Sequence, residues 1–275
     1  MRVILVPVAD RPECAKALSV AFDIGKRLGA SVSGCHMRPH RYSEVSMSNA
    51  FSNAAWRKKC TNKAPAAAQA LYRCAAEQRG YDLIRRAREK PGALWAERVG
   101  SPDVLMGIFG PVSDLIVVSR PARSRNVADM FMRAALLESS RPVLILPQTT
   151  RRRVGKRIVI AWNQSTEVAR SVSAAMPLLV AATEVSIVSC GPEDHPGPKS
   201  TQVVAYLKHW GVNAEHFETR GRKIEPELMA AYKELEGDLI IAGAYSRSRW
   251  REKVFGGTTE FLLRKARIPV LTVHM

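Results

Sequence analysis

The chain has 275 residues, of which 46% are hydrophobic and 24% charged, a composition that is typical of a globular protein and excludes a disordered chain. No apolar run approaches the roughly 18–20 residues of a membrane-spanning helix, so we expect no membrane span. Lys and Arg number 42 against 25 Asp and Glu, which gives a formal net charge of +17. The basic residues are spread over both halves and no nucleic-acid-binding motif collects them, so they predict a solvated basic surface.

The five cysteines form no metal or disulfide pattern. None belongs to a CxxC pair or lies at a zinc-ligand spacing from a histidine; they are Cys14, Cys35, Cys60, Cys74 and Cys190. Reduced thiols are typical of the cytosol, so we expect a cytoplasmic protein. The six histidines are predicted to be surface or hydrogen-bonded residues rather than metal ligands.

The first half of the chain is predicted to alternate strands and helices. An apolar strand at residues 3–8 is followed by a helix at 13–28, which Gly29 can end, and by a strand at 31–36. The Ala-rich stretch at 49–90 predicts one or two long helices broken near Pro65. Continuous apolar strands at 114–118 and 142–146 end this half and are typical of strands buried in a parallel sheet.

The second half is predicted to begin in the same way. A strand at residues 157–162 is followed by a turn at 163–166, a helix from 167 to about 182 and a strand at 184–189. Three prolines predict a loop at 191–199. The remaining predicted elements are a short helix at 201–210, a strand at 213–217, a helix at 225–235, a strand at 238–242, a helix ending at Lys265 and a strand at 269–273. The carboxylates of Glu225 and Glu227 are expected to face solvent on a helix surface.

The two halves repeat one pattern of elements. Residue numbers differ by 154 between Glu13 and Glu167 and between Ala15 and Ala169, and the last two strands of each half also match. Strands that alternate with long helices predict parallel βαβ crossovers and a doubly wound sheet. The sequence therefore predicts two tandem α/β domains, at residues 1–148 and 155–275, joined by a polar, basic linker.

A glycine-rich segment in the second half is the main candidate for a binding site. Gly243 follows a predicted buried strand, where a glycine allows the backbone to approach a ligand closely. Further along, Gly256-Gly257-Thr258-Thr259 precedes the last predicted helix, and the free amides at a helix start favour an anion. Four basic residues lie between these two places: Arg247, Arg249, Arg251 and Lys253. In an open parallel sheet such a segment lies at the carboxyl ends of the strands, where ligands bind.

These residues, with the turn Asn163-Gln164-Ser165, resemble those of the universal stress protein family in its tandem two-domain form. ATP-binding members carry the pattern G-x2-G-x9-G-[S/T] between the fourth strand and the last helix. Gly243 fills the first position, Ser246 replaces the second glycine and Gly256 fills the third. Gly257 stands where Ser or Thr is usual, and Thr258 follows it directly. The 163–165 turn resembles the family's D-x-S turn with an amide in place of the carboxylate.

The resemblance implies a fold, a ligand and a set of site residues. Each half would be a Rossmann-like, doubly wound α/β domain with a mainly parallel five-stranded sheet, and the two domains would pair through their last strands. The implied ligand is an adenine nucleotide (ATP, ADP or AMP), with Mg²⁺ as an accompanying ion, and the implied role is a regulatory one in a stress response. The implied binding residues are Asn163 and Ser165 near the ribose, and Gly243, Ser246, Arg247, Gly256, Gly257, Thr258 and Thr259 near the phosphates. Whether whole chains also form a homodimer is left open.

The first half departs from the same pattern. Ala9 stands at the position of Asn163, and Ser119 at that of the first glycine. Asp129 falls at the position of Gly256, where a carboxylate satisfies helix amides internally and repels phosphate. We therefore expect the first domain to bind no nucleotide.

Other functions are weighed against nucleotide binding. No catalytic motif stands out, so we expect no enzyme activity beyond slow ATP hydrolysis. The departures at Ser246 and Gly257 would fit an interaction module in which neither domain binds a nucleotide. The net charge of +17 would fit nucleic-acid binding that weakens steeply as the salt concentration rises, a function that we do not expect here.

Overall fold

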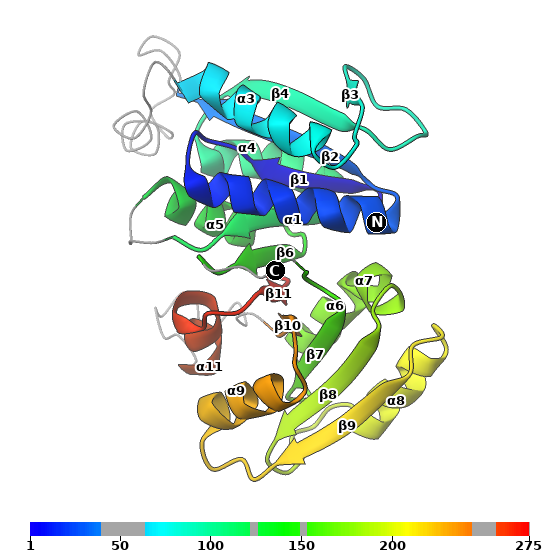
Figure 1. Ribbon diagram of the computed structural model, residues 1–275. Coiled ribbons are helices and arrows are strands. Elements are labelled where there is room, and N and C mark those ends of the chain that lie inside the picture. The colour runs from blue at the N-terminus through cyan, green and yellow to red at the C-terminus, as the bar shows by residue number, and fades with distance from the viewer. Residues whose placement is uncertain (40–63, 122–125, 149–152, 244–256, 275) are drawn as a thin grey trace. The chain divides into compact units, whose positions relative to one another are not determined.

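The computed structural model describes residues 1–39, 64–121, 126–148, 153–243 and 257–274 (Figure 1). The chain divides into two units, Met1–Gln148 and Thr149–Met275. In both units the paired strands run parallel, as their continuous apolar sequences predict. None of the helices in the described ranges is long and apolar enough to cross a membrane.

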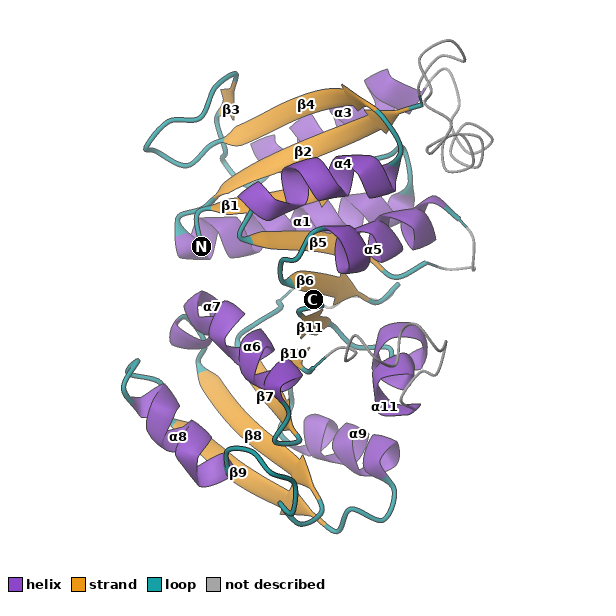
Figure 2. Ribbon diagram, turned by 180° about the vertical axis from the view of Figure 1, so that it is seen from behind, coloured by secondary structure: helices purple, strands orange, loops and turns teal. Residues whose placement is uncertain are grey.

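The described part of the first unit contains one six-stranded parallel sheet. In chain order its elements are β1 (Val3–Pro7), α1 (Pro12–Leu28), β2 (Ser31–Arg38), α3 (Ala64–Glu77), β3 (Leu83–Ile84), β4 (Ala93–Val99), α4 (Pro102–Phe109), the 3₁₀ turn η3 (Gly110–Val112), β5 (Leu115–Ser119), α5 (Val127–Glu138) and β6 (Val143–Leu146). The strands lie in the order β3-β4-β2-β1-β5-β6. Figures 1 and 2 show α1 and α3 on one face of this sheet and α4 and α5 on the other.

The central strands of this sheet are buried on both faces. Ile4 and Val6 of β1 and Ile116 and Val117 of β5 have no exposed surface. Burial of such a side chain contributes about 1.5–3 kcal/mol, so these strands form the stable centre of the unit. Gly29 ends α1 in the left-handed conformation (φ 62°), which confirms the predicted helix end.

The prediction that the Ala-rich stretch stays helical up to residue 90 is wrong. Residues 49–63 of that stretch lie outside the described residues. Pro65 stands in the first described turn of α3, where a missing N–H costs little, and the predicted break near it is not tested because the preceding residues lie outside the described ranges. The helix ends at Glu77, well before residue 90, because Gly80 turns the chain in the left-handed conformation (φ 69°). The following residues form β3 and β4, so the unit has one short edge strand beyond the five expected.

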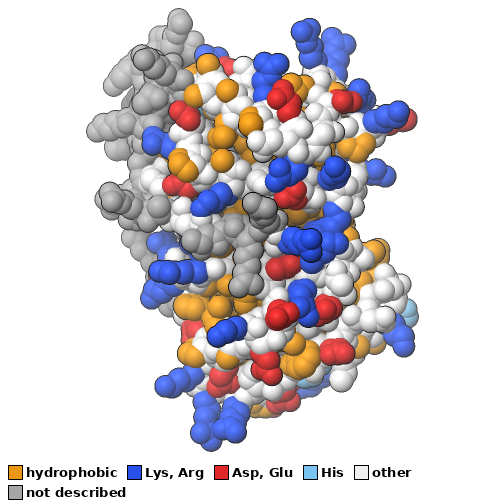
Figure 3. Space-filling model, viewed as in Figure 1, with side chains coloured by type: hydrophobic (Ala, Val, Ile, Leu, Met, Phe, Trp, Pro, Cys, Tyr) orange, Lys and Arg blue, Asp and Glu red, His pale blue; other side chains and the backbone are white. Residues whose placement is uncertain are grey.

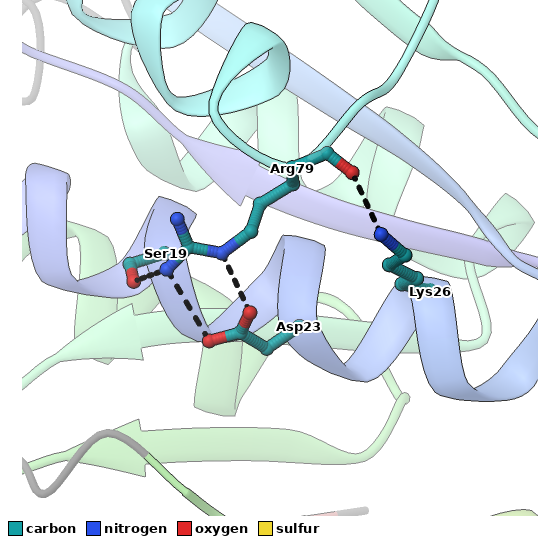
Figure 4. Close-up of polar contacts among 4 residues, drawn as sticks. All are labelled: Ser19, Asp23, Lys26 and Arg79. Atoms are coloured by element: carbon teal, nitrogen blue, oxygen red, sulfur yellow. Dashed lines mark hydrogen bonds and ion pairs between the residues drawn. The ribbon is translucent and has the colours of Figure 1, made fainter.

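An arginine after α3 fixes the end of that helix to α1. The guanidinium of Arg79 donates to Asp23 Oδ1 at 2.6 Å through Nε and to Ser19 Oγ at 2.7 Å (Figure 4). Lys26 Nζ in turn donates to the carbonyl of Arg79 at 3.5 Å. These contacts link two helices that cover the same face of the sheet.

The described part of the second unit has one five-stranded parallel sheet. Its elements are β7 (Arg157–Trp162), α6 (Thr166–Ala174), α7 (Met176–Val180), β8 (Glu184–Cys190), α8 (Ser200–Lys208), β9 (Ala214–Thr219), α9 (Ile224–Glu234), β10 (Leu239–Ile241), α11 (Gly257–Glu260), the π-helical turn η4 (Phe261–Lys265) and β11 (Val270–Thr272). The strands lie in the order β11-β10-β7-β8-β9. The helices α6, α7 and α8 cover one face of this sheet, and α9 and α11 cover the other (Figures 1 and 2).

The single helix predicted from residue 167 to about 182 is divided in two. The division falls at Ala175, between α6 and α7. Pro177 explains it, because proline lacks the N–H that a continuous helix would donate to the carbonyl four residues earlier.

The two units share one strand topology. In each, the first strand is central, the next two long strands lie to one side of it and the last two to the other. Corresponding aspartates also make corresponding contacts: Asp114 accepts the N–H of Arg2 at 2.5 Å, and Asp238 accepts the N–H of Lys156 at 2.9 Å. The predicted doubly wound α/β fold class is therefore confirmed.

Candidate functional site

A cavity of about 260 Å³ lies at the carboxyl ends of the strands of the second unit. It opens where the strand order changes direction, between β7 and β10, which is the place where open α/β sheets bind ligands. Among the residues that line it are Trp162, Asn163, Ser189, Cys190, Gly243 and Thr258. The cavity thus brings together the ends of β7, β8 and β10 with the start of α11.

Asn163 and Ser165 form a hydrogen-bonded turn beside this cavity. The Ser165 hydroxyl donates to Asn163 Oδ1 at 2.7 Å. Ser165 Oγ also accepts the N–H of Val168 at 3.3 Å and so caps the start of α6. Asn163 is exposed and lines the cavity, whereas Ser165 supports the turn that positions it.

Gly243, which follows β10, packs closely against the first turn of α6. A Cβ atom at this position would lie 2.9 Å from Val168 N and 3.0 Å from Glu167 Cβ. Only a glycine leaves room for this contact. Gly243 therefore has a packing role in addition to its place in the cavity wall.

Thr258 belongs to the segment at residues 256–259, which we call the glycine-threonine segment, and its side chain already contacts another part of the protein. Thr258 lines the cavity, and its hydroxyl donates to Glu225 Oε1 at 3.3 Å. Gly257 begins α11. The remaining predicted phosphate contacts lie outside the described residues: Ser246, Arg247, Gly256 and the side chain of Thr259.

A loop that the sequence analysis did not connect with the site covers part of the cavity. Gln164 has a left-handed backbone (φ 61°), and its buried side chain bonds to residues 195 and 197 of the 191–199 loop. Trp162 Nε1 donates to the carbonyl of Pro198 at 2.9 Å. The loop is also packed without spare room, because a Cβ at Gly197 would lie 2.1 Å from the Gln164 carbonyl oxygen. The prolines indicated a loop, but the positive φ of Gln164 has no signal in the sequence.

The expectation that Glu225 and Glu227 simply face solvent is wrong. Both side chains are only partly exposed. Glu227 accepts the N–H groups of Gly221, Arg222 and Lys223 at 2.7–2.9 Å and fixes the turn before α9. The nearby Thr219 hydroxyl and these main-chain bonds lower the pKa of Glu227 to about 2. The turn it holds places Ile224 and Leu228 in the cavity wall.

A serine and a histidine form a close pair behind the cavity wall. The Ser189 hydroxyl and His216 Nε2 are 2.6 Å apart and link β8 to β9, so His216 is hydrogen-bonded, as predicted. In the described ranges no three His, Cys, Asp or Glu side chains come together in a way that could hold a metal ion. The chemistry that the cavity offers is therefore an apolar wall with amide and hydroxyl groups, a histidine and the carboxylate of Glu193, and Glu225 lies beyond Thr258.

The corresponding end of the first unit is built differently. Ser119, at the position of Gly243, donates its hydroxyl to the carbonyl of Glu13 at 2.6 Å. Arg120 follows it with a buried side chain, and burial lowers its pKa to about 10. Asp129 stands buried in the first turn of α5, and the Asn126 side chain caps that helix. Ser119 and Asp129 thus stand at positions that glycines hold in the second half of the sequence.

The fold and the cavity together define a doubly wound, Rossmann-like α/β protein with a cavity at the switch point of its second sheet. Residues 156–274 match the model of the universal stress protein family. The C-terminal half of the chain is therefore a universal stress protein domain, and the resemblance seen in the sequence is confirmed there.

Solved structures similar to this chain match it over both units. A universal stress protein from Archaeoglobus fulgidus DSM 4304 matches with a TM-score of 0.64 and 16% identity, over 99% of this chain and 96% of that chain. A putative universal stress protein from Pseudomonas aeruginosa UCBPP-PA14 matches with a TM-score of 0.54 and 16% identity, over 100% and 93%. A functionally unknown protein from Pseudomonas aeruginosa PAO1 matches with a TM-score of 0.53 and 14% identity, over 100% and 92%. No curated protein matches the sequence.

Proposed function

We propose that the second unit binds an adenine nucleotide in the cavity at the carboxyl ends of β7, β8 and β10, as part of a stress-response or regulatory role. The observation that carries this proposal is the position of the cavity at the switch point of a universal stress protein domain. Its apolar wall, which includes Val188, Ile224 and Leu228, suits a flat aromatic base. Asn163 at the rim supplies an exposed amide for the ribose.

The phosphates of the nucleotide, ATP, ADP or AMP, would lie toward the glycine-threonine segment. Thr258 is the described residue that lines the cavity on that side. The sequence places Ser246, Arg247, Gly256, Gly257 and Thr259 with it. Mg²⁺ would accompany the phosphates of ATP, held by phosphate oxygens, since the described residues offer no acidic cluster for it.

We infer that the chain is a tandem universal stress protein whose first unit binds no nucleotide. The shared strand topology supports the tandem form. The Ser119–Glu13 bond and the buried Asp129 support an unoccupied first unit, because they satisfy polar groups internally. Pairing of the two domains through their last strands and formation of a homodimer stay predictions.

A titration with a fluorescent ATP analogue tests the proposal. We expect saturable binding to the wild-type chain and its loss in Gly256→Asp, which places a carboxylate where phosphate would lie. Gly107→Asp makes the same change at an exposed helix position of the first unit and is expected to leave binding intact. Equal binding by both variants would refute the proposed site.

The second candidate function is an interaction module that binds no nucleotide. It is favoured by the carboxylate of Glu225, which already accepts the Thr258 hydroxyl. Absence of saturable binding by the wild-type chain, at protein concentrations up to about 1 mM, would support this function instead. Figure 3 shows the Lys and Arg side chains of the described residues scattered among acidic and apolar ones on the visible face, so this face offers no basic patch that would favour nucleic-acid binding.

A further inference from the structure

A carboxylate lies at the end of the cavity that is proposed for phosphate. Glu225 Oε1 accepts the Thr258 hydroxyl at 3.3 Å. The same oxygen would lie 3.2 Å from a Cβ atom built on Gly257. Glu225 thus touches the two described residues that begin α11, although it comes from the first turn of α9.

Glu225 is held in this place by its neighbours on α9. Glu227 fastens the preceding turn through the N–H groups of Gly221, Arg222 and Lys223. Ile224 packs into the cavity wall, and its carbonyl accepts a weak hydrogen bond from Cys190 Sγ at 3.9 Å. The turn before α9 is therefore fixed, and the Glu225 carboxylate at the start of this helix lies close to Thr258.

This carboxylate changes what the phosphate end of the cavity accepts. It uses the Thr258 hydroxyl as a donor, so that donor is no longer available to a phosphate oxygen. A glutamate carboxylate is negative at neutral pH, and like charges within about 4–6 Å of each other strongly disfavour one another. The penalty grows with each further negative charge that a ligand brings to this end.

We propose that Glu225 is a specificity residue that selects a nucleotide of low negative charge, an adenosine monophosphate, over a triphosphate. The inference rests on the proposed nucleotide site and names its ligand class.

Equilibrium titrations of AMP and ATP test the inference with the full chain in a buffer that contains a chelator, so that no metal ion masks phosphate charge. We expect the wild-type chain to bind AMP at least about tenfold more tightly than ATP. Glu225→Gln keeps the shape and the acceptor oxygen but removes the charge. It should tighten ATP binding by about tenfold and change AMP binding by less than about threefold.

A matched control is Glu234→Gln, which removes the same charge from an exposed position at the other end of α9. It should leave the ratio of the AMP and ATP dissociation constants at the wild-type value. Glu225→Ala, a second variant, should shift the ratio in the same direction as Glu225→Gln. Binding of both nucleotides with a ratio that neither Glu225 variant changes would overturn this inference alone. Failure of every variant to bind either nucleotide would overturn the proposed function and the inference with it.

Discussion

Replacement of Gly243 by alanine is expected to destabilise the second unit and weaken ligand binding together. The new Cβ would lie 2.9 Å from Val168 N, about 0.5 Å closer than the 3.4 Å at which ordinary contact begins. The atom that must give way belongs to the main chain in the first turn of α6. It cannot rotate aside as a flexible side chain would, so β10 and α6 must separate.

The size of the effect follows from two opposing terms. Overpacking of a tight interior contact costs about 1–3 kcal/mol. Alanine recovers about 0.4–1 kcal/mol by restricting the unfolded chain. We therefore expect a net loss of about 1–2 kcal/mol in the free energy of unfolding. Because Ser165 caps the displaced turn and positions Asn163, nucleotide affinity should fall as well.

Urea unfolding followed by circular dichroism, with a nucleotide titration on the same samples, measures both effects. Gly107→Ala is the control: it lies within α4, and a Cβ there meets no atom within 4 Å. That change should stabilise the chain by about 0.5–1 kcal/mol, as alanine favours a helix over glycine. If Gly243→Ala raised stability as Gly107→Ala does, the close contact between β10 and α6 would be refuted.

Two further predictions concern polar contacts that hold helices and turns. Arg79→Ala should lower the free energy of unfolding by about 1 kcal/mol. A double-mutant cycle with Asp23→Ala should give a coupling free energy of about 0.5–1 kcal/mol. Additive effects of the two substitutions would contradict the pairing of Arg79 with Asp23 in Figure 4. Glu227→Gln should destabilise the chain at pH 6 and lose this effect as the pH falls toward 2, because the pKa of this carboxylate is lowered from its ordinary value to about 2. A carboxylate with a lowered folded-state pKa stabilises the folded state above its unfolded pKa of about 4.3 and loses that contribution as the pH falls through the folded value. Urea unfolding at pH 6, 4 and 2.5 gives the free energy of unfolding of Glu227→Gln and of the wild-type chain. If the two free energies differed by the same amount at all three pH values, the prediction would be contradicted.

The strands were predictable because burial on both faces leaves a simple signal. Residues 157–162 and 184–189 were expected as strands, and β7 and β8 span Arg157–Trp162 and Glu184–Cys190. Continuous apolar runs of this length occur where a strand has helices on both sides. The same patterns revealed that the two halves repeat.

Strands near the edge of a sheet and breaks within helices were harder to predict. β4 carries partly exposed and charged residues such as Glu97 and Arg98, so it lacks the apolar run of a central strand. The division between α6 and α7 depends on Pro177, whose effect the helical pattern around it hides.

Within the candidate site, the residues next to the strands were predictable and their partners were not. Asn163, Gly243 and Thr258 line the cavity, as expected from their places after strands and before a helix. The bond from Thr258 to Glu225 joins residues 33 positions apart in the sequence, and no local pattern signals it. The same is true of Gln164, whose contacts with the 191–199 loop depend on the tertiary fold.

Photocrosslinking with 8-azido-ATP, mapped by peptide mass spectrometry, tests the central claim most directly, because it reports where the base lies in the intact chain. We expect modification in the peptides that contain residues 161–164 or 188–193, which line the cavity, and its suppression by an excess of unlabelled AMP. Suppressible modification confined to residues 1–148, with none in the second unit, would contradict it.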